Sequence, residues 1–204
     1  MNQTFHNDYN KFMLTLLENG FEEEVPEGEL FRDYRKVGMY HPKKPTQIRI
    51  IFECSAKYRG ISLNDVLLQG SDDLVDVLRP FRREPVGMMG DIEKMFHQVM
   101  VIQNNRDCME LYCWPVGDLE YQLKIYTMAV HIFGAVSSLS CTNYALQETI
   151  KDDKQLFSNR ITQSALSRLY VDDWLNLVPT HEEVVQLVRE ISTLCQTHQM
   201  GVKQ

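Results

Sequence analysis

The sequence predicts an α+β fold in which short antiparallel strands pack against helices. Apolar residues recur at helical spacing near both ends of the chain, in residues 4–19 and 181–198. Between these ends, several runs rich in β-branched and aromatic residues are bounded by turn residues, as in hairpins. No repeat, low-complexity tract or long linker divides the 204 residues, which suffice for one large domain or two closely packed subdomains.

The N-terminal part is predicted to contain a helix followed by two polar connections. Residues 4–19 form the helix, and Gly20 ends it. The acidic run EEEVPEGE at 22–29 is predicted to be a solvated connection. The basic run YRKVGMYHPKKPTQ at 34–47 is either an exposed turn or a loop that faces phosphate.

A strand is predicted at 47–54, with alternate side chains on opposite faces. Ile48, Ile50 and Phe52 share one face, and Arg49 lies on the other. An arginine in the middle of a strand either pairs with an acid or binds an anionic ligand. The sequence at this point leaves both roles open.

The central part is predicted to contain two helices and then a strand, a turn and a strand. The helices are expected at 62–69 and 72–84, and Pro80 should kink or break the second. The strand–turn–strand unit is expected within 86–103, with Asp91 at the C-terminal end of its first, buried strand. Strand ends are where open sheets place chemistry.

A hairpin and a helix are predicted next. The hairpin strands are expected within 108–114 and 120–129, followed by a turn at 131–134. Either Ser137 or Ser138 is expected to cap the helix that follows the turn.

Two adjacent acids stand in the apolar, β-prone run RLYVDDWLNLVP at 168–179. The pattern predicts two short strands joined by a tight turn, with Asp172 and Asp173 at its tip. A buried pair of charges is costly unless it is neutralised, and carboxylate oxygens suit magnesium, calcium or manganese. An ordinary hairpin turn is the alternative, because aspartate tolerates turn geometry.

Asp91 has a similar context, since an apolar strand delivers it to its end. If the two strands are neighbours, Asp91 converges with Asp172 and Asp173. Such a cluster can hold two divalent ions about 4 Å apart, which clamp the attacking and leaving oxygens of a phosphoryl transfer. The residues alone do not distinguish a polymerase from a nuclease.

Bulk composition restricts the function only weakly. The formal net charge of −7 and the sequence pI of about 5.4 argue against a basic nucleic-acid coat, but not against a polymerase with local basic surfaces. The five cysteines form no CxxC pair, which favours a reducing intracellular compartment. The sequence contains neither a signal peptide nor an apolar span of about 20 residues, so a protein that is neither secreted nor membrane-spanning is expected.

Four segments, in this order, resemble the reverse transcriptase of BEL/Pao-type long-terminal-repeat retrotransposons. They are YHPKKPTQIRIIFECSAKYRGISLNDVLLQG at 40–70, GDIEKMFHQV at 90–99, HIFGAVSSLSCTNYAL at 131–146 and YVDD at 170–173. The resemblance runs from about Gly20 to near the C-terminus.

The resemblance implies the fingers and palm of a right-handed polymerase, with an antiparallel palm sheet, packed helices and no thumb. Residues 1–85 would form the N-terminal helix and fingers, and residues 86–204 mainly the palm with some fingers. No thumb, ribonuclease H or integrase segment is expected, so the chain would be a fragment of a retroelement polyprotein or a truncated copy. The expected location is the cytoplasm or retroelement particles.

The implied activity is RNA-directed DNA polymerisation by two-metal nucleotidyl transfer onto a primer 3′-hydroxyl. Asp91, Asp172 and Asp173 would be the catalytic, metal-binding triad, and the backbone carbonyl of Ile92 would add a ligand. The cofactors would be two Mg²⁺ or Mn²⁺ ions. The partners would be an RNA or DNA template with primer, deoxynucleoside triphosphates and other polyprotein domains, with no membrane.

Nucleotide contacts are implied in the fingers and beside the first acid. Arg49 matches the fingers arginine that contacts the triphosphate, where its planar fork suits phosphate. Lys43 or Lys44 would be the accompanying lysine. Phe96 matches an aromatic beneath the incoming sugar, where a bulky ring excludes a ribose 2′-hydroxyl.

Further contacts are implied around the 131–146 segment and the YVDD motif. Phe133 and Gly134 match the turn that faces the nascent base pair. The small Ser137 and Ser138 would let the template approach closely, and Tyr170 is assigned with them to the template and primer.

Three single-residue departures from the family pattern raise a second hypothesis. Leu139 stands in place of proline, Gly90 in place of alanine, and Trp174 in place of a smaller residue just after YVDD. The large ring of Trp174 could displace the acids, which would make the chain a catalytically silent remnant with weak nucleic-acid binding at most. A third hypothesis is a metal-dependent nuclease or phosphatase that uses the same acids.

Overall fold

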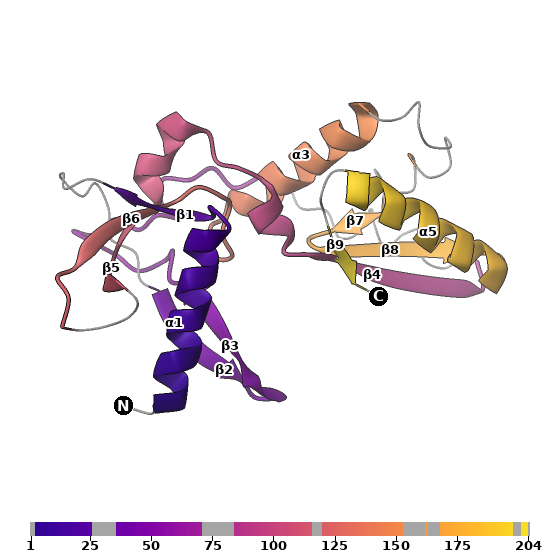
Figure 1. Cartoon of the computed structure of the whole chain (residues 1–204). Helices are drawn as coiled ribbons and strands as arrows, with labels where there is room; N and C mark the ends of the chain where they lie inside the picture. The colour runs from indigo at the N-terminus through magenta and orange to yellow at the C-terminus, as the bar shows by residue number, and fades with distance from the viewer. Residues whose placement is uncertain are drawn as a thin grey trace. The chain divides into compact units, whose positions relative to one another are not determined.

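A computed structural model of the protein describes residues 3–25, 36–70, 84–115, 120–152, 162, 168–197 and 201–203. The chain divides into two compact units, each built from two separate stretches of sequence (Figure 1). Unit 1 consists of Met1–Leu68 and Val99–Ser138, and unit 2 consists of Gln69–Gln98 and Leu139–Gln204.

A three-stranded antiparallel sheet lies in unit 1. Its strands are β1 (Glu22–Val25), β5 (Glu110–Cys113) and β6 (Lys124–Met128), in the order β1-β6-β5. The pairing of β5 with β6 confirms the hairpin predicted within 108–114 and 120–129. The short helix η2 (Gln103–Met109) leads into β5.

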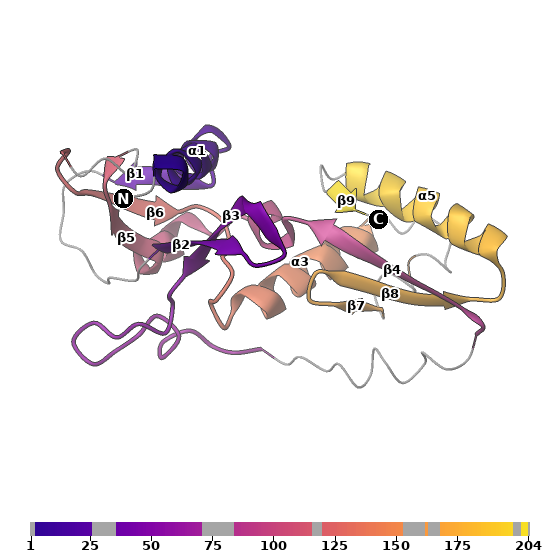
Figure 2. The ribbon, with the colours of Figure 1, turned by 90° about the horizontal axis from the view of Figure 1, so that it is seen from below.

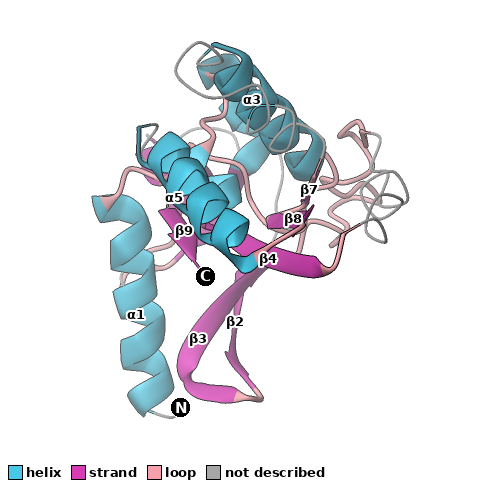
Figure 3. Cartoon of the chain, turned by 90° about the vertical axis from the view of Figure 1, so that its right-hand side faces the viewer, coloured by secondary structure: helices cyan, strands magenta, loops and turns pink. Residues whose placement is uncertain are grey.

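Helix α1 (Gln3–Glu18) packs in unit 1 against a hairpin of β2 (Lys36–His41) and β3 (Lys44–Phe52), as Figure 3 shows. Gly38 allows this close packing, since a Cβ atom there would lie 2.9 Å from Cζ of Phe5 on the helix. The bounds of α1 confirm the helix predicted at 4–19.

Strand β3 has the two faces that its alternation predicts. Phe52 is buried and Ile50 is half-buried, whereas Arg49 and Ile51 on the other face are exposed. The buried face joins the core of unit 1, which gathers side chains from α1, β3, η2, β5, β6 and the loops next to them. Its members are Met13, Leu16, Phe52, Cys54, Leu63, Val101, Met109, Leu111, Cys113, Tyr126, Met128, Val130, Ile132 and Ala135.

The prediction that the acidic run begins as a solvated connection is wrong, because Glu22–Val25 is strand β1. Three consecutive glutamates each pair with a cation from a different element. The pairs are Glu22–Lys36, Glu23–Arg106 at 2.8 Å and Glu24–Lys124 at 2.7 Å. These contacts let an acidic segment serve as a sheet strand.

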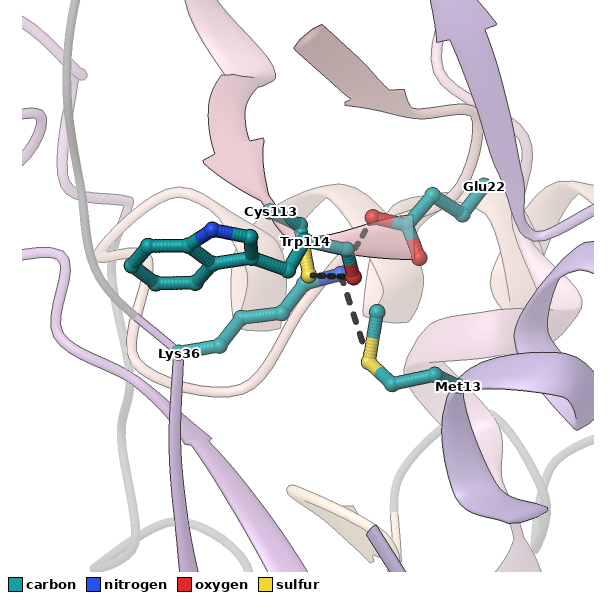
Figure 4. A network of polar contacts seen from close by, with 5 residues as sticks. All are labelled: Met13, Glu22, Lys36, Cys113 and Trp114. Carbon is teal, nitrogen blue, oxygen red and sulfur yellow. Dashed lines mark hydrogen bonds and ion pairs between the residues drawn. The ribbon is translucent and has the colours of Figure 1, made fainter. Parts of the chain in front are cut away.

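The pair of Glu22 and Lys36 is almost completely withdrawn from solvent, with 0% and 2% of the two side chains exposed. Lys36 Nζ also approaches Met13 Sδ at 3.9 Å, as the close-up in Figure 4 shows. Burial raises the pKa of Glu22, and the neighbouring ammonium opposes that shift. Among the described residues, Oε2 of Glu22 has no hydrogen-bond partner. Removal of either partner would leave the other charge buried and unpaired, which is costly.

Unit 2 contains a four-stranded antiparallel sheet. Its strands are β4 (Val86–Glu93), β7 (Leu169–Tyr170), β8 (Asp173–Val178) and β9 (Gly201–Lys203), in the order β7-β8-β4-β9. Figure 2 shows β7, β8 and β4 running side by side.

Helices α3 (Ser138–Asp152) and α5 (His181–Thr197) supply apolar side chains to the core of unit 2. This core combines them with side chains from β4, η1 and β8: Ile92, Met95, Leu146, Ile150, Trp174, Val178, Leu187 and Ile191. Both predicted helices are confirmed.

Two predicted elements of the central part are wrong, and a third lies almost entirely outside the described residues. Residues 62–69 form a short turn rather than a helix. The second strand predicted within 86–103 is replaced by the helix η1 (Met95–Gln98) and by an isolated bridge between Met100 and Val130. Of the helix predicted at 72–84, all but its last residue lies outside the described residues. Within the described ranges, no helix is long and apolar enough to cross a membrane.

Candidate metal centre

Three acids converge on the sheet of unit 2. In the pairing of β4 with β8, Asp91 lies directly opposite Asp173. Asp172 lies in the loop between β7 and β8, and its carbonyl accepts a hydrogen bond from the Ile92 backbone N–H at 2.8 Å. One carboxylate oxygen from each acid lies within 4.8 Å of the others. Residues 81 positions apart in the chain are thus brought together by strand pairing.

Alternation along the strands places the acids away from the helices. On β8, Trp174 and Val178 are buried in the core, whereas Asp173 between the loop and Trp174 is only half-buried. On β4, the buried Ile92 follows the half-buried Asp91. The same period-2 pattern on both strands therefore sets the acids on the more open face of the sheet.

The loop that carries Asp172 contains an unusual backbone conformation. Val171 has φ +57°, in the left-handed region that a β-branched residue rarely adopts. Positive φ at the first central residue of a two-residue hairpin loop, but not at the second, is typical of a type II′ turn. This conformation costs about 1–2 kcal/mol for a residue with a side chain. The pairing of β7 with β8 and the hydrogen bond to Ile92 hold the loop in this shape.

Trp174 does not displace the acids. Its side chain is 3% exposed and packs in the core of unit 2, on the face opposite to Asp173. Its partner across the β4–β8 pair is Gly90, which has no side chain. Two of the departures from the family pattern therefore lie opposite each other in the sheet.

The three acids repel one another. Burial raises the pKa of Asp173, and the charges of Asp172 and Asp91 raise it further. A divalent cation would relieve this repulsion, and carboxylate oxygens are the ligands that Mg²⁺ and Mn²⁺ prefer. These three residues could therefore hold a metal ion, and their chemistry fits the predicted cofactor.

Other predicted residues of unit 2 lie on elements next to the acids. Tyr170 on β7 is half-buried and pairs with Asp173. Phe96 on η1 is 5% exposed, so its ring is buried in the chain as it stands. Burial, reinforced by the charge of Lys94, lowers the pKa of His97 to about 4. The imidazole of His97 is therefore neutral near pH 7.

The predicted nucleotide and template residues outside these elements belong to unit 1. Arg49 and Lys43 are exposed on the β2–β3 hairpin, and Lys44 begins β3. Phe133 is 46% exposed, and the adjoining Gly134 has φ +99°. Ser137 is half-buried, and the buried Ser138 begins α3.

Gly134 lies close to the end of β3. A Cβ atom on Gly134 would stand 2.7 Å from the carbonyl oxygen of Phe52, which is closer than real Cβ contacts allow. Together with its positive φ, this contact requires glycine at the position. The structure therefore brings the Gly134 turn to the strand that carries Arg49.

One residue in this region was not predicted from the sequence. The side chain of Asn64 hydrogen-bonds both to the carbonyl of Gly134 and to the N–H of Val136. Its turn is held by Ser62 and Asp65, whose S-x-x-D spacing is the signature of a capping box. The spacing of Ser62 and Asp65 in the sequence indicates a fixed turn around Asn64, but it does not reveal that Asn64 bonds to Gly134, 70 residues away.

The fold matches solved structures of a retroviral enzyme. The crystal structure of the protease–reverse transcriptase of prototype foamy virus in its native form aligns with a TM-score of 0.70 and 14% identity, over 99% of this chain and 24% of that one. A selenomethionine-labelled mutant of that enzyme aligns with a TM-score of 0.67, with the same identity and coverage. No family model matches the sequence. No curated protein matches it either.

The chain therefore has a reverse-transcriptase-like fold. It spans about a quarter of the length of the foamy-virus chain, 24%. At 14% identity the likeness establishes the fold alone.

Proposed function

We propose that this chain is the fingers and palm portion of an RNA-directed DNA polymerase of the BEL/Pao retrotransposon type. The observation that carries the proposal is the convergence of Asp91, Asp172 and Asp173 within 4.8 Å on a sheet of a reverse-transcriptase-like fold. The four motifs in the sequence support the retrotransposon type. Unit 2 would be the palm, and unit 1 would be the fingers.

The acids would hold the catalytic cations. Asp91 and Asp172 would be the principal ligands, with Asp173 and the Ile92 carbonyl beside them. Two bound Mg²⁺ or Mn²⁺ ions would lower the pKa of the primer 3′-hydroxyl and stabilise the departing pyrophosphate. The paired strands β4 and β8 keep the ligands in place, so little reorganisation is needed when cations bind.

Residues of unit 1 would bind the incoming deoxynucleoside triphosphate. Arg49 projects from the exposed face of β3, where its guanidinium can make paired hydrogen bonds to phosphate oxygens. Lys43 or Lys44 would add a second positive charge. Phe133 and Gly134 would face the nascent base pair.

Selection of the sugar and contact with the template involve further residues. Phe96 would lie beneath the sugar and exclude a 2′-hydroxyl, which requires its buried ring to border the nucleotide when bound. Ser137 and Ser138 would lie against the template, and Tyr170 against the primer end. Other domains of a retroelement polyprotein would complete the grip on template and primer.

Primer extension tests the proposal. The protein is incubated with a primed RNA template, deoxynucleoside triphosphates and Mg²⁺ or Mn²⁺, and extended primer is measured. Extension should require the cation and be abolished by Asp172→Asn, whereas Asp107→Asn, at an exposed position of unit 1, should leave it intact.

Extension that survives Asp172→Asn would contradict the role of that acid. A folded protein that binds cation but extends no primer would instead fit the hypothesis of a silent copy. Cation-dependent release of nucleotides from a labelled strand, without added triphosphate, would favour a nuclease.

A further inference from the structure

The side chain of Asn64 joins two segments of unit 1 that are 70 residues apart. Its Nδ2 group donates a hydrogen bond to the Gly134 carbonyl at 2.9 Å, and its Oδ1 atom accepts one from the Val136 N–H at 3.0 Å. Both ends of the amide are therefore used on the same turn. A side chain with only a donor or only an acceptor cannot make this pair of contacts.

Asn64 is itself held firmly in place. Its backbone N–H donates to the Cys54 carbonyl at 3.1 Å, just beyond the end of β3. The Ser62 N–H donates to Asp65 Oδ2 at 2.9 Å, and the Asp65 N–H donates to Ser62 Oγ at 3.2 Å. The buried Leu63 anchors the same turn in the core of unit 1. Asn64 therefore projects from a fixed base.

The turn that Asn64 contacts is anchored at its flanks and exposed at its tip. Ile132 and Ala135 are buried on either side, but Phe133 and Gly134 between them are exposed. The backbone of Gly134 approaches the Phe52 carbonyl so closely that only glycine fits. The hydrogen bonds to the Gly134 carbonyl and from the Val136 N–H fix the turn directly after this contact.

We propose that Asn64 is a positioning residue for the binding of deoxynucleoside triphosphate. The inference rests on the proposed function, in which Arg49 on β3 and Phe133 on the turn both contact the nucleotide. Asn64 is tied by its backbone to the end of β3 and by its side chain to the turn. It thereby fixes one set of contacts relative to the other, without touching the nucleotide itself.

The test compares two variants with the wild type. Asn64→Ala removes both contacts with the turn. Asn64→Asp keeps the shape and the acceptor for the Val136 N–H, but places a carboxylate oxygen where Nδ2 donates to Gly134. Asn104→Ala is the matched control, because Asn104 is an exposed asparagine on η2 in the same unit.

Primer extension then separates binding from chemistry. Asn64→Ala should raise the KM for deoxynucleoside triphosphate about tenfold, the effect of losing one or two hydrogen bonds. The kcat and the KM for primed template should stay close to wild type. Asn64→Asp should give an intermediate KM, and the control should show no change. Calorimetric titration of deoxynucleoside triphosphate with Mn²⁺ makes the same comparison without turnover.

Hydrogen exchange at the Val136 amide provides a readout that does not depend on activity. Exchange should become about tenfold faster in Asn64→Ala, since one hydrogen bond is lost, and stay slow in Asn64→Asp. Faster exchange with an unchanged KM and triphosphate affinity would overturn the inference while leaving the proposed function intact. A fall in kcat together with a rise in the KM for primed template, both as large as the change in the KM for triphosphate, would also overturn it. Asn64 would then support the fold in general.

Failure of the proposed function gives a different pattern. A wild-type protein that neither extends primers nor binds triphosphate would remove the nucleotide role from Asn64 as well. The exchange data would then show only whether Asn64 holds the turn.

Discussion

Replacement of Asp173 by asparagine should stabilise the protein in the absence of metal. The three carboxylates lie no more than 4.8 Å apart, so each pair repels by about 0.9 kcal/mol with water-like screening and about 3.5 kcal/mol at an effective dielectric constant near 20. Asp173→Asn removes two of these pairs and keeps the shape of the side chain. Because the acids are only half-buried, we take the weaker interaction, which gives a gain of about 2 kcal/mol.

Thermal unfolding measures this gain directly. For a protein of this size, about 2 kcal/mol raises the Tm by about 4–8 °C. Without metal, the native state holds the Asp173 proton more tightly than the unfolded chain, because the pKa of Asp173 is raised above its ordinary value of 3.8. The contribution of Asp173 to wild-type stability therefore increases as the pH falls through that raised pKa, so the advantage of the variant should narrow in acid.

Added Mn²⁺ should reverse the order. A ligand that binds only the native state raises stability according to its concentration relative to Kd. Mn²⁺ should therefore raise the Tm of the wild type more than that of Asp173→Asn, which keeps Asp91 and Asp172 but lacks the third carboxylate. Asp107→Asn, at an exposed site, should match the wild type in both conditions. A metal-free variant less stable than the wild type, or one stabilised equally by Mn²⁺, would refute the reasoning.

Three further predictions concern the buried groups. Lys36→Met should lower the free energy of unfolding in urea by about 3–5 kcal/mol, since it leaves a buried carboxylate unpaired, and this loss should shrink as the pH falls and the carboxylate takes up a proton. The control Lys124→Met, which breaks a half-exposed ion pair, should cost no more than about 1 kcal/mol. Equal losses in the two variants would contradict the burial argument. The free energy of unfolding should fall as the pH drops from about 6.5 to about 4, because the imidazole of His97 takes up a proton in the unfolded chain at a higher pH than in the native state. His97→Gln should flatten this dependence by up to about 3 kcal/mol. An unaltered pH profile would show that another group causes it. Gly90→Ala should destabilise the wild type by about 1–3 kcal/mol through crowding of Trp174, the residue opposite it in the sheet. The same change should have little effect in a Trp174→Cys background. Additive effects in this double-mutant cycle would contradict a contact between positions 90 and 174.

The sequence predicts elements whose patterns are local. The alternation of Ile50 and Phe52 against Arg49 correctly predicts the faces of β3 because period 2 acts within one strand. The turn after Tyr170 is likewise a local signal, but it holds Val171 and Asp172 alone. The prediction that Asp173 also lies at the tip is wrong, because Asp173 begins β8 and pairs with Tyr170. The convergence of the acids was predicted from two similar strand contexts and the family resemblance, although Asp91 lies within β4 rather than at its end.

The errors come from contacts that are distant in sequence. Glu22–Val25 looks like a solvated connection because the cation that pairs with Glu22 lies 14 residues away, and those for Glu23 and Glu24 lie 83 and 100 residues away. Residues 62–69 have a helical apolar pattern, but their capping box closes only a single turn. The bridge of Met100 to Val130 pairs one residue rather than a strand. Tertiary partners decide each of these cases.

Crystals of the protein grown with Mn²⁺ test the central claim most directly. The anomalous signal of manganese locates each ion independently of the protein atoms. The proposed function predicts two ions about 4 Å apart, shared by Asp91 and Asp172. Crystals in which Mn²⁺ binds elsewhere, or in which the three carboxylates turn apart and leave no ion between them, would contradict it.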